Sequence, residues 1–168
     1  MKDTKSYLSK IVQDMPDSGI KDFFDVANTM EGALSLGVGE PDFPTPEHVR
    51  EAAIASIKKG DTKYTDNRGT VELRAAAADY LTKFDLHYDK QDEILITMGA
   101  SEGIDLALRT LVNPGEEVLV AEPSYVSYIP CIELCGGVPV SLKLRAENKF
   151  RLTREQLEEK ITEKSKVL

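Results

Sequence analysis

The first stretch of the sequence that could do chemistry is a short apolar run followed by three small residues. Residues 94–98 have the length of a buried strand, and Gly99-Ala100-Ser101 follows them directly. Apolar residues then recur with helical spacing at Ile104, Ala107, Leu108 and Leu111. A strand that turns into a helix at a glycine presents backbone N–H groups at the positive end of the helix dipole, where phosphate binds. A tight turn that binds nothing would show the same pattern.

A second loop with a candidate binding residue follows the next apolar run. Residues 118–121 are expected to form a buried strand, and residues 122–125, which end in Tyr125, form the loop beyond its carboxyl end. The carboxyl ends of parallel strands meet at one edge of a sheet, and ligands bind there. Tyr125 and the turn at Gly99 are therefore expected at the same edge, which favours an anion site over an empty turn. Tyr64 is a third candidate, because it is an aromatic residue inside a polar loop.

Alternating helices and strands must position these loops. The pattern predicts helices near residues 46–59, 70–84, 102–111, 126–134 and 153–162, and strands near 94–98, 118–121, 138–144 and from 166 onward. Such alternation predicts right-handed βαβ units and an α/β fold, an αβα sandwich with a mostly parallel sheet. The inner faces of the first two helices are expected at Val49, Ala53, Ile57, Leu73, Ala77, Tyr80, Leu81 and Phe84. Residues 1–30 read as two short helical pieces around a turn at 17–19, an arm that must pack on another surface.

Composition excludes several classes of protein. The 21 basic and 29 acidic residues give a net charge of −8, without a basic stripe, which argues against nucleic acid or an anionic membrane as a partner. No apolar run approaches the ~20 residues of a membrane span, and the N-terminus lacks the apolar core of a signal peptide, so a cytoplasmic protein is expected. The two cysteines, Cys131 and Cys135, are expected to be reduced and structural, with no metal site.

Five ordered motifs together carry a resemblance to a known family. They are Leu-Gly-Val-Gly-Glu-Pro-Asp-Phe-Pro-Thr-Pro at 36–46, Tyr64 with Asn-Arg-Gly at 67–69 and Glu-Leu-Arg at 72–74, Thr-Met-Gly-Ala-Ser at 97–101, Asn-Pro-Gly-Glu-Glu-Val at 113–118, and Glu-Pro-Ser-Tyr at 122–125. They resemble the N-terminal half of the class I/II aminotransferases, the aspartate aminotransferase family of fold-type-I pyridoxal phosphate enzymes. The resemblance implies an N-terminal arm and substrate-side segment at 1–45 and the first, incomplete part of the pyridoxal-phosphate-binding domain at 46–168.

The resemblance assigns roles to the candidate residues. Gly99, Ala100 and Ser101 match the loop that binds the cofactor phosphate, and Tyr125 matches the aromatic residue that stacks on the pyridine ring. Tyr64 matches a tyrosine that reaches the phosphate bound in the neighbouring subunit, which implies a homodimer. Substrate binding is implied for Gly39, beside the α-carboxylate, and for Ile20 in the arm.

The catalytic groups of the family do not match this sequence. Its Schiff-base lysine, the aspartate at the pyridine nitrogen and the arginine that clamps the substrate carboxylate belong to motifs beyond Leu168. The sequence is therefore expected to be a truncated aminotransferase, inactive alone, whose parent exchanges an amino group between an amino acid and a 2-oxo acid. C–S lyases and aminocyclopropane-carboxylate synthases share these motifs, and a non-catalytic pyridoxal-phosphate-sensing domain is a further alternative.

Overall fold

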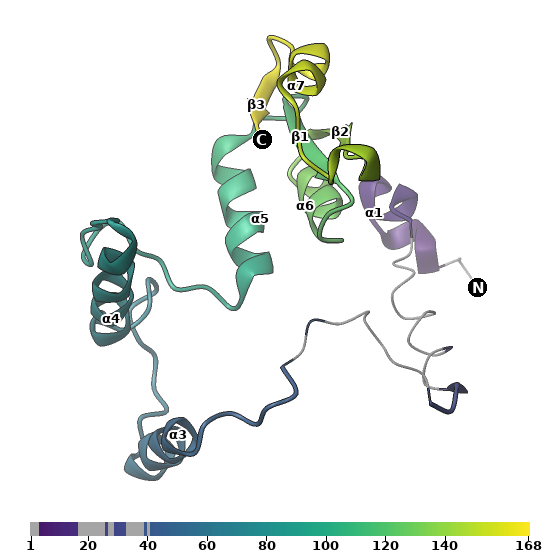
Figure 1. Ribbon diagram of the computed structural model, residues 1–168. Helices are drawn as coiled ribbons and strands as arrows, with labels where there is room; N and C mark the ends of the chain where they lie inside the picture. The colour runs from purple at the N-terminus through teal and green to yellow at the C-terminus, as the bar shows by residue number, and fades with distance from the viewer. Residues whose placement is uncertain (1–3, 17–25, 27–28, 33–38, 40) are drawn as a thin grey trace. The chain divides into compact units, whose positions relative to one another are not determined.

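The computed structural model describes residues 4–16, 26, 29–32, 39 and 41–168 (Figure 1). The chain divides into two compact units. One consists of Met1–Ser18 with Thr97–Leu168 and contains a sheet, and the other is Gly19–Ile96 and contains helices. We call them the sheet unit and the helical unit.

A parallel sheet of three strands forms the centre of the sheet unit. The strands are β1 (Glu117–Glu122), β2 (Val138–Lys143) and β3 (Ser165–Val167), in the order β2-β1-β3. β1 pairs with β2 over its whole length, from Glu117 opposite Val138 to Glu122 opposite Lys143, and with β3 on its other side. The central strand β1 therefore has a neighbour on both edges, and its carboxyl end leads into the loop with Tyr125.

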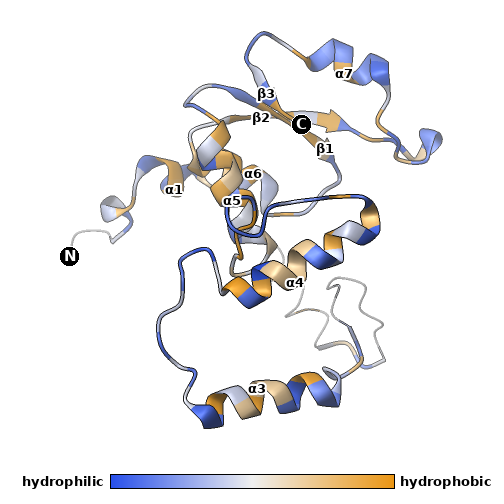
Figure 2. Ribbon diagram, turned by 90° about the vertical axis from the view of Figure 1, so that its left-hand side faces the viewer, coloured by the Kyte–Doolittle hydropathy of each residue, from blue (hydrophilic) through white to orange (hydrophobic). Residues whose placement is uncertain are grey.

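Helices cover both faces of this sheet. α6 (Tyr128–Leu134) connects β1 to β2, and α7 (Arg154–Lys160) connects β2 to β3. The first connection moves to one side of β1 and the second moves back past it, so two right-handed crossovers must place α6 and α7 on opposite faces. Figure 2 shows this arrangement, with the strands between α7 and the pair α5 and α6. The predicted α/β fold with an αβα sandwich and a mostly parallel sheet is confirmed.

The core of the sheet unit lies between β1 and two helices. α5 (Ala100–Leu111) packs against α6, and both face the side of β1 that carries Val118 and Val120. The buried cluster consists of Leu108, Val112, Val118, Val120, Cys131 and Ile132. Burial of these apolar side chains holds α5, β1 and α6 together in one structure.

Short elements complete the sheet unit. They are the 3₁₀ helices η1 (Thr4–Tyr7) and η3 (Ala146–Asn148) and the helix α1 (Lys10–Asp14). α1 packs against α6, so this first part of the arm lies on the body of the sheet unit, which is one of the two expected positions. The turn predicted at 17–19 falls outside the described residues.

The helical unit contains two of the predicted helices, but their predicted buried faces are wrong. α3 (Glu47–Lys59) ends at Gly60 in the left-handed conformation, and α4 (Val71–Leu81) begins after Thr70, whose side chain accepts a hydrogen bond from the Leu73 amide. The short 3₁₀ helix η2 (Thr82–Phe84) extends α4. No residue of α3 is buried, and α4 buries Arg74 and none of its predicted apolar residues. Helical periodicity identifies an apolar stripe, but it does not say whether another element covers the stripe.

The strand predicted at 94–98 is also wrong. No strand is assigned to these described residues, and the amide of Ile96 donates instead to the carbonyl of Arg68, at 3.0 Å. A strand exists only when a neighbour completes its ladder of hydrogen bonds, and none of the described strands pairs with this segment. The apolar run at 94–98 indicates side chains that suit a sheet. Whether the segment forms a strand depends on a partner strand, which its own sequence does not specify.

Candidate cofactor phosphate site

The turn before α5 has a conformation that requires glycine. Gly99 is the N-cap residue of α5, with φ of 84° and ψ of 171°, a region of backbone conformation that L-residues with a side chain avoid. A Cβ at this position would meet nothing within 4 Å, so the backbone and not crowding is the constraint. The turn thus points the first amides of a 12-residue helix outward, where an anion can accept from them.

Two hydrogen bonds fix this turn. The hydroxyl of Thr97 donates to the carbonyl of Gly99 at 2.9 Å, and the amide of Met98 donates to the carboxylate of Glu102. The first bond closes the backbone at Gly99, and the second connects the segment before Gly99 to the first turn of α5. The donor groups at the helix N-terminus are therefore held in place before any ligand binds.

Two hydroxyl groups meet beside this turn. The Oγ of Ser101 lies 3.1 Å from the phenolic oxygen of Tyr125, within hydrogen-bond distance. Hydrogen bonds from Ser101 and then from Ser127 lower the pKa of the Tyr125 phenol below its ordinary value. The Tyr125 ring is 51% exposed and packs edge-on against Tyr128, with ring centroids 5.7 Å apart and planes at 80°. A flat ring with an open face and a polar end therefore stands next to the helix N-terminus.

The structure brings together four of the seven residues predicted for the site. Gly99, Ala100, Ser101 and Tyr125 lie at the carboxyl-terminal edge of β1 and the start of α5, as expected from the sequence. Tyr64 and Gly39 belong to the helical unit, where Tyr64 is completely exposed and a Cβ on Gly39 would meet nothing within 4 Å. Ile20 lies outside the described residues. The roles of Tyr64, Gly39 and Ile20 stay predictions.

Sequence reasoning missed several residues that shape these loops. Thr97 and Glu102 close the turn at Gly99, and Glu122 at the end of β1 accepts a hydrogen bond from Ser141 of β2. Arg74 is fully buried in the helical unit. The sequence signal that could have indicated the first two is the polar residue two positions before Gly99 and the acidic residue three positions after it.

The described part of the chain was also searched for a metal site and for membrane-spanning helices. It contains no group of three or more His, Cys, Asp or Glu side chains able to hold a metal ion. Cys131 is a buried free thiol and Cys135 a partly buried one. Among the same residues, no helix combines the length and the apolar character needed to cross a membrane.

The fold and the candidate site together indicate a class of protein. The N-terminus of α5 and the aromatic side chain of Tyr125 lie at the carboxyl edge of a parallel sheet, which is where α/β proteins bind phosphate-bearing cofactors. The profile of the family "Aminotransferase class I and II" matches residues 31–168. The chain belongs to this family.

Individual relatives agree with the family assignment. The chain is 48% identical over 164 residues to the Bacillus subtilis protein named "Putative aminotransferase YugH", covering 97% of this chain and 42% of that protein. It is 41% identical over 162 residues to aromatic-amino-acid aminotransferase 2 of Thermococcus litoralis, covering 96% of this chain and 42% of that protein. The crystal structure of aspartate aminotransferase from Thermotoga maritima superimposes with a TM-score of 0.87 at 34% identity, covering 95% of this chain and 44% of that one. This chain thus spans less than half the length of these relatives.

Proposed function

We propose that this chain forms part of a pyridoxal-phosphate-dependent aminotransferase, which moves an amino group between an amino acid and a 2-oxo acid. The observation that carries the proposal is the pair of hydroxyls of Ser101 and Tyr125, 3.1 Å apart at the N-terminus of α5. The names of the relatives, which are aminotransferases, support this reaction over the lyase and synthase alternatives.

The residues present suit the phosphate end of the cofactor. The backbone amides of Ala100 and Ser101, together with the Ser101 hydroxyl, offer donors to a phosphate dianion, which only accepts hydrogen bonds. The conformation of Gly99 orients these donors, and the helix dipole adds attraction for negative charge. The open face of Tyr125 can stack on the pyridine ring, a contact worth about 0.5–1.5 kcal/mol beyond burial.

Pyridoxal phosphate, when bound, supplies a carbonyl carbon that exchanges amino groups and a ring that accepts electrons. The role of this chain is to hold and orient that group through Gly99, Ala100, Ser101 and Tyr125. The lysine that the family uses for covalent attachment has no counterpart in the motifs of this sequence, so we propose that these 168 residues alone do not catalyse amino transfer.

The remaining roles are part of the same proposal. Tyr64, on an exposed loop of the helical unit, is proposed to reach the phosphate bound by a second copy of the chain in a homodimer. Gly39 and Ile20 are proposed to contact the substrate, with residues 1–45 as the arm and substrate-side segment and 46–168 as part of the cofactor domain. The cytoplasmic location expected from the sequence stays a prediction.

The reaction is tested on the full-length gene product. It is incubated with pyridoxal phosphate, an amino acid and either 2-oxoglutarate or pyruvate, and the products are separated by chromatography. We expect a new amino acid to form in the same amount as the new 2-oxo acid. Release of ammonia or a thiol without amino transfer would contradict the proposal and favour a lyase.

We call the turn at residues 99–101 the phosphate turn, and two matched glycine variants test its role. Gly99 and Gly115 both have φ near +85°, and a Cβ on either would meet nothing within 4 Å. Replacement of either by alanine should lower the free energy of unfolding by about 1–3 kcal/mol, because the backbone conformation is strained with a side chain. Only Gly99→Ala should also weaken binding of pyridoxal phosphate, measured by equilibrium dialysis. Equal affinity in the two variants would exclude Gly99 from the site.

A further inference from the structure

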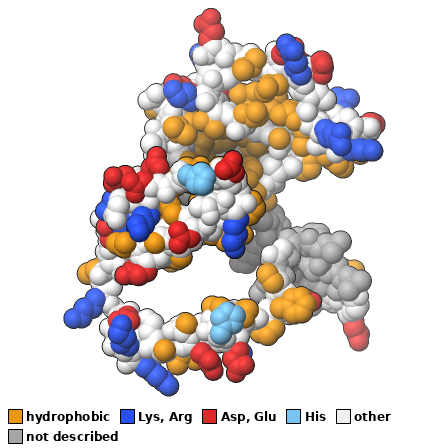
Figure 3. Space-filling model, turned by 60° about the vertical axis from the view of Figure 1, so that its left-hand side comes forward, with side chains coloured by type: hydrophobic (Ala, Val, Ile, Leu, Met, Phe, Trp, Pro, Cys, Tyr) orange, Lys and Arg blue, Asp and Glu red, His pale blue; other side chains and the backbone are white. Residues whose placement is uncertain are grey.

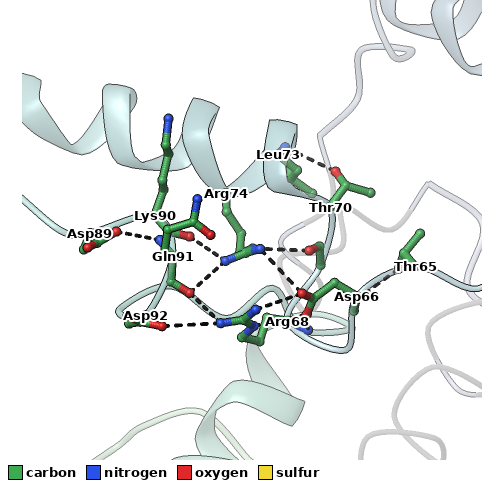
Figure 4. A network of polar contacts seen from close by, with 11 residues as sticks. Thr65, Asp66, Arg68, Thr70, Leu73, Arg74, Asp89, Lys90, Gln91 and Asp92 are labelled. Carbon is green, nitrogen blue, oxygen red and sulfur yellow. Dashed lines mark hydrogen bonds and ion pairs between the residues drawn. The ribbon is translucent and has the colours of Figure 1, made fainter.

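The helical unit contains a buried arginine that sequence analysis did not predict. Arg74 is 0% exposed, and its guanidinium donates to three carbonyl oxygens: from Nε to Gly69 at 3.2 Å and from Nη1 to Lys90 at 2.5 Å and Gln91 at 2.9 Å. Its Nη2 lies 3.7 Å from a carboxylate oxygen of Asp66. Figure 4 shows the guanidinium between the loop at 66–70 and the segment at 89–92. One side chain therefore ties together two pieces of chain that are distant in sequence.

A second arginine completes this connection. Arg68 donates to both carboxylate oxygens of Asp66, from Nε at 3.1 Å and from Nη2 at 2.9 Å, and its Nη1 donates to the carbonyl of Gln91 at 2.7 Å. Asp66 thus serves two guanidinium groups, and its hydrogen bonds with Arg68 hold the pKa of its carboxyl far below the usual range. We call Asp66, Arg68 and Arg74, with the carbonyls that they bind, the arginine clamp.

Backbone contacts reinforce the arginine clamp. The amide of Ile96 donates to the carbonyl of Arg68 at 3.0 Å. Gly69, at φ of +94°, lies so close to Ile96 that a Cβ on it would approach the Ile96 side chain to 2.5 Å. The loop that precedes α4 is therefore fixed on the segment that leads to the phosphate turn.

Tyr64 stands two residues before the arginine clamp. Its side chain is completely exposed, and the described structure gives it no hydrogen-bond partner of its own. Its position is consequently set by the backbone of the loop that carries it. Ordering a loop on binding costs about 1–2 kcal/mol per residue, and a loop that is already held avoids that cost.

We infer that Arg74 is a positioning residue for phosphate recognition: it touches no phosphate itself, and it holds the loop from which the Tyr64 hydroxyl binds the cofactor phosphate held by a second copy of the chain. The inference rests on the proposed function. Lysine at position 74 would keep the charge but lose the planar fork that reaches Gly69, Lys90 and Gln91 together. The loop would then be free to move, and the hydroxyl of Tyr64 would bind the phosphate less often.

A double-mutant cycle tests the connection between Arg74 and Tyr64. Equilibrium dialysis of the full-length protein compares pyridoxal phosphate with pyridoxal, which lacks the phosphate, for wild type, Arg74→Lys, Tyr64→Phe and the double variant. Arg74→Lys should weaken binding of pyridoxal phosphate about tenfold, the order expected for one charge-assisted hydrogen bond, and leave pyridoxal binding unchanged. The double variant should bind no more weakly than Tyr64→Phe.

Two results would overturn the inference. Equal losses for both ligands would indicate general damage to the protein, and additive losses in the double variant would show that Arg74 does not act through Tyr64. Arg154→Lys is the matched control, because Arg154 pairs with Glu158 on the surface of α7 and should change neither affinity. If Arg74→Lys does not fold, Arg68→Lys perturbs the same arginine clamp from a side chain that is 46% exposed.

Hydrogen exchange separates failure of the inference from failure of the proposed function. In Arg74→Lys the amides of Gly69 and Ile96 should exchange several-fold faster, while the amide of Gly115, bonded to Gly136 in the sheet unit, should not change. Unchanged exchange at Gly69 and Ile96 would overturn the inference even if wild type binds pyridoxal phosphate. Faster exchange in a protein that binds pyridoxal phosphate no better than pyridoxal would instead refute the phosphate site.

Discussion

At the scale of single residues, Ser101 and Tyr125 form the contact on which the proposed cofactor site depends. They are 24 positions apart in sequence, on α5 and on the loop after β1, and their hydroxyls meet at 3.1 Å. The Tyr125 ring is half exposed and meets Tyr128 edge-on, so the polar contact with Ser101 helps to define its direction. The pair is therefore a measurable reporter of whether the site is formed.

Removing the Ser101 hydroxyl should raise the pKa of Tyr125. The hydrogen bond from Ser101 is the largest cause of the lowered pKa, so in Ser101→Ala the pKa should move up toward the ordinary value of 10.0. Because folding lowers this pKa, its contribution to stability is present above pH 10.0 and is lost as the pH falls through the folded value. NMR of ring-labelled tyrosine over pH 8 to 12, roughly spanning the ordinary tyrosine range, measures the change.

Ser127→Ala is the control for this titration. Ser127 is the second cause of the lowered pKa, so its loss should raise the pKa by less than the loss of Ser101. An unchanged Tyr125 titration in Ser101→Ala would show that the two hydroxyls are not bonded in solution.

The positions of the candidate site residues can be predicted from the sequence where they depend on neighbouring residues. Glycine and serine at the start of a helix, and tyrosine after a strand, predict the turn at residues 99–101 and the neighbouring Tyr125, which the structure brings together. Arg74 was not predictable, because an arginine in a helix ordinarily lies on the surface, and the carbonyls that permit its burial come from positions 69, 90 and 91.

At the scale of elements, periodicity predicts the helices better than the strands. Thr153 opens α7 with a complete capping box: its side chain accepts from the Gln156 amide at 3.3 Å, and the Gln156 side chain accepts from the Thr153 amide at 3.1 Å. Both bonds join residues within 153–156, so the local sequence is enough to indicate them. The prediction of a strand at 94–98 is wrong, because a strand needs a pairing partner from outside the segment.

Loss of the Thr153 hydroxyl should destabilise α7. Thr153→Ala leaves the Gln156 amide without its acceptor and should lower the free energy of unfolding by about 1 kcal/mol. Urea denaturation followed by circular dichroism measures the loss. Thr153→Ser keeps the hydroxyl and should retain nearly all of the stability; equal losses in the two variants would show that the methyl group, not the cap, is responsible.

At the scale of the whole molecule, the sheet unit leaves part of its apolar interior uncovered. A groove of about 410 Å³ lies along β1 and β3 and is lined by Ile104, Ala107, Val120, Ile132, Val167 and Leu168. Figure 3 shows hydrophobic side chains gathered on a face of the unit that contains the sheet. Contiguous apolar surface of this kind binds other apolar groups, so the groove should govern how the 168 residues behave in solution.

A dye that fluoresces on apolar surfaces should bind this groove. The 168-residue chain should enhance the fluorescence of 8-anilinonaphthalene-1-sulfonate several-fold. Ala107→Glu places a charge at the groove and should remove most of the enhancement. Thr110→Glu, on the same helix and outside the groove lining, is the matched control and should keep it. Equal enhancement in Ala107→Glu and wild type would locate the dye elsewhere.

The same groove has a thermal consequence. The heat capacity of unfolding grows with the apolar surface that folding removes from water, about 12–15 cal/mol/K per residue in ordinary domains. The groove leaves part of the apolar surface of the sheet unit in contact with water in the folded chain, and that part adds little to this increment. The stability curve of the 168 residues should therefore be flat, changing slowly on heating or cooling, and it should steepen when an apolar partner fills the groove.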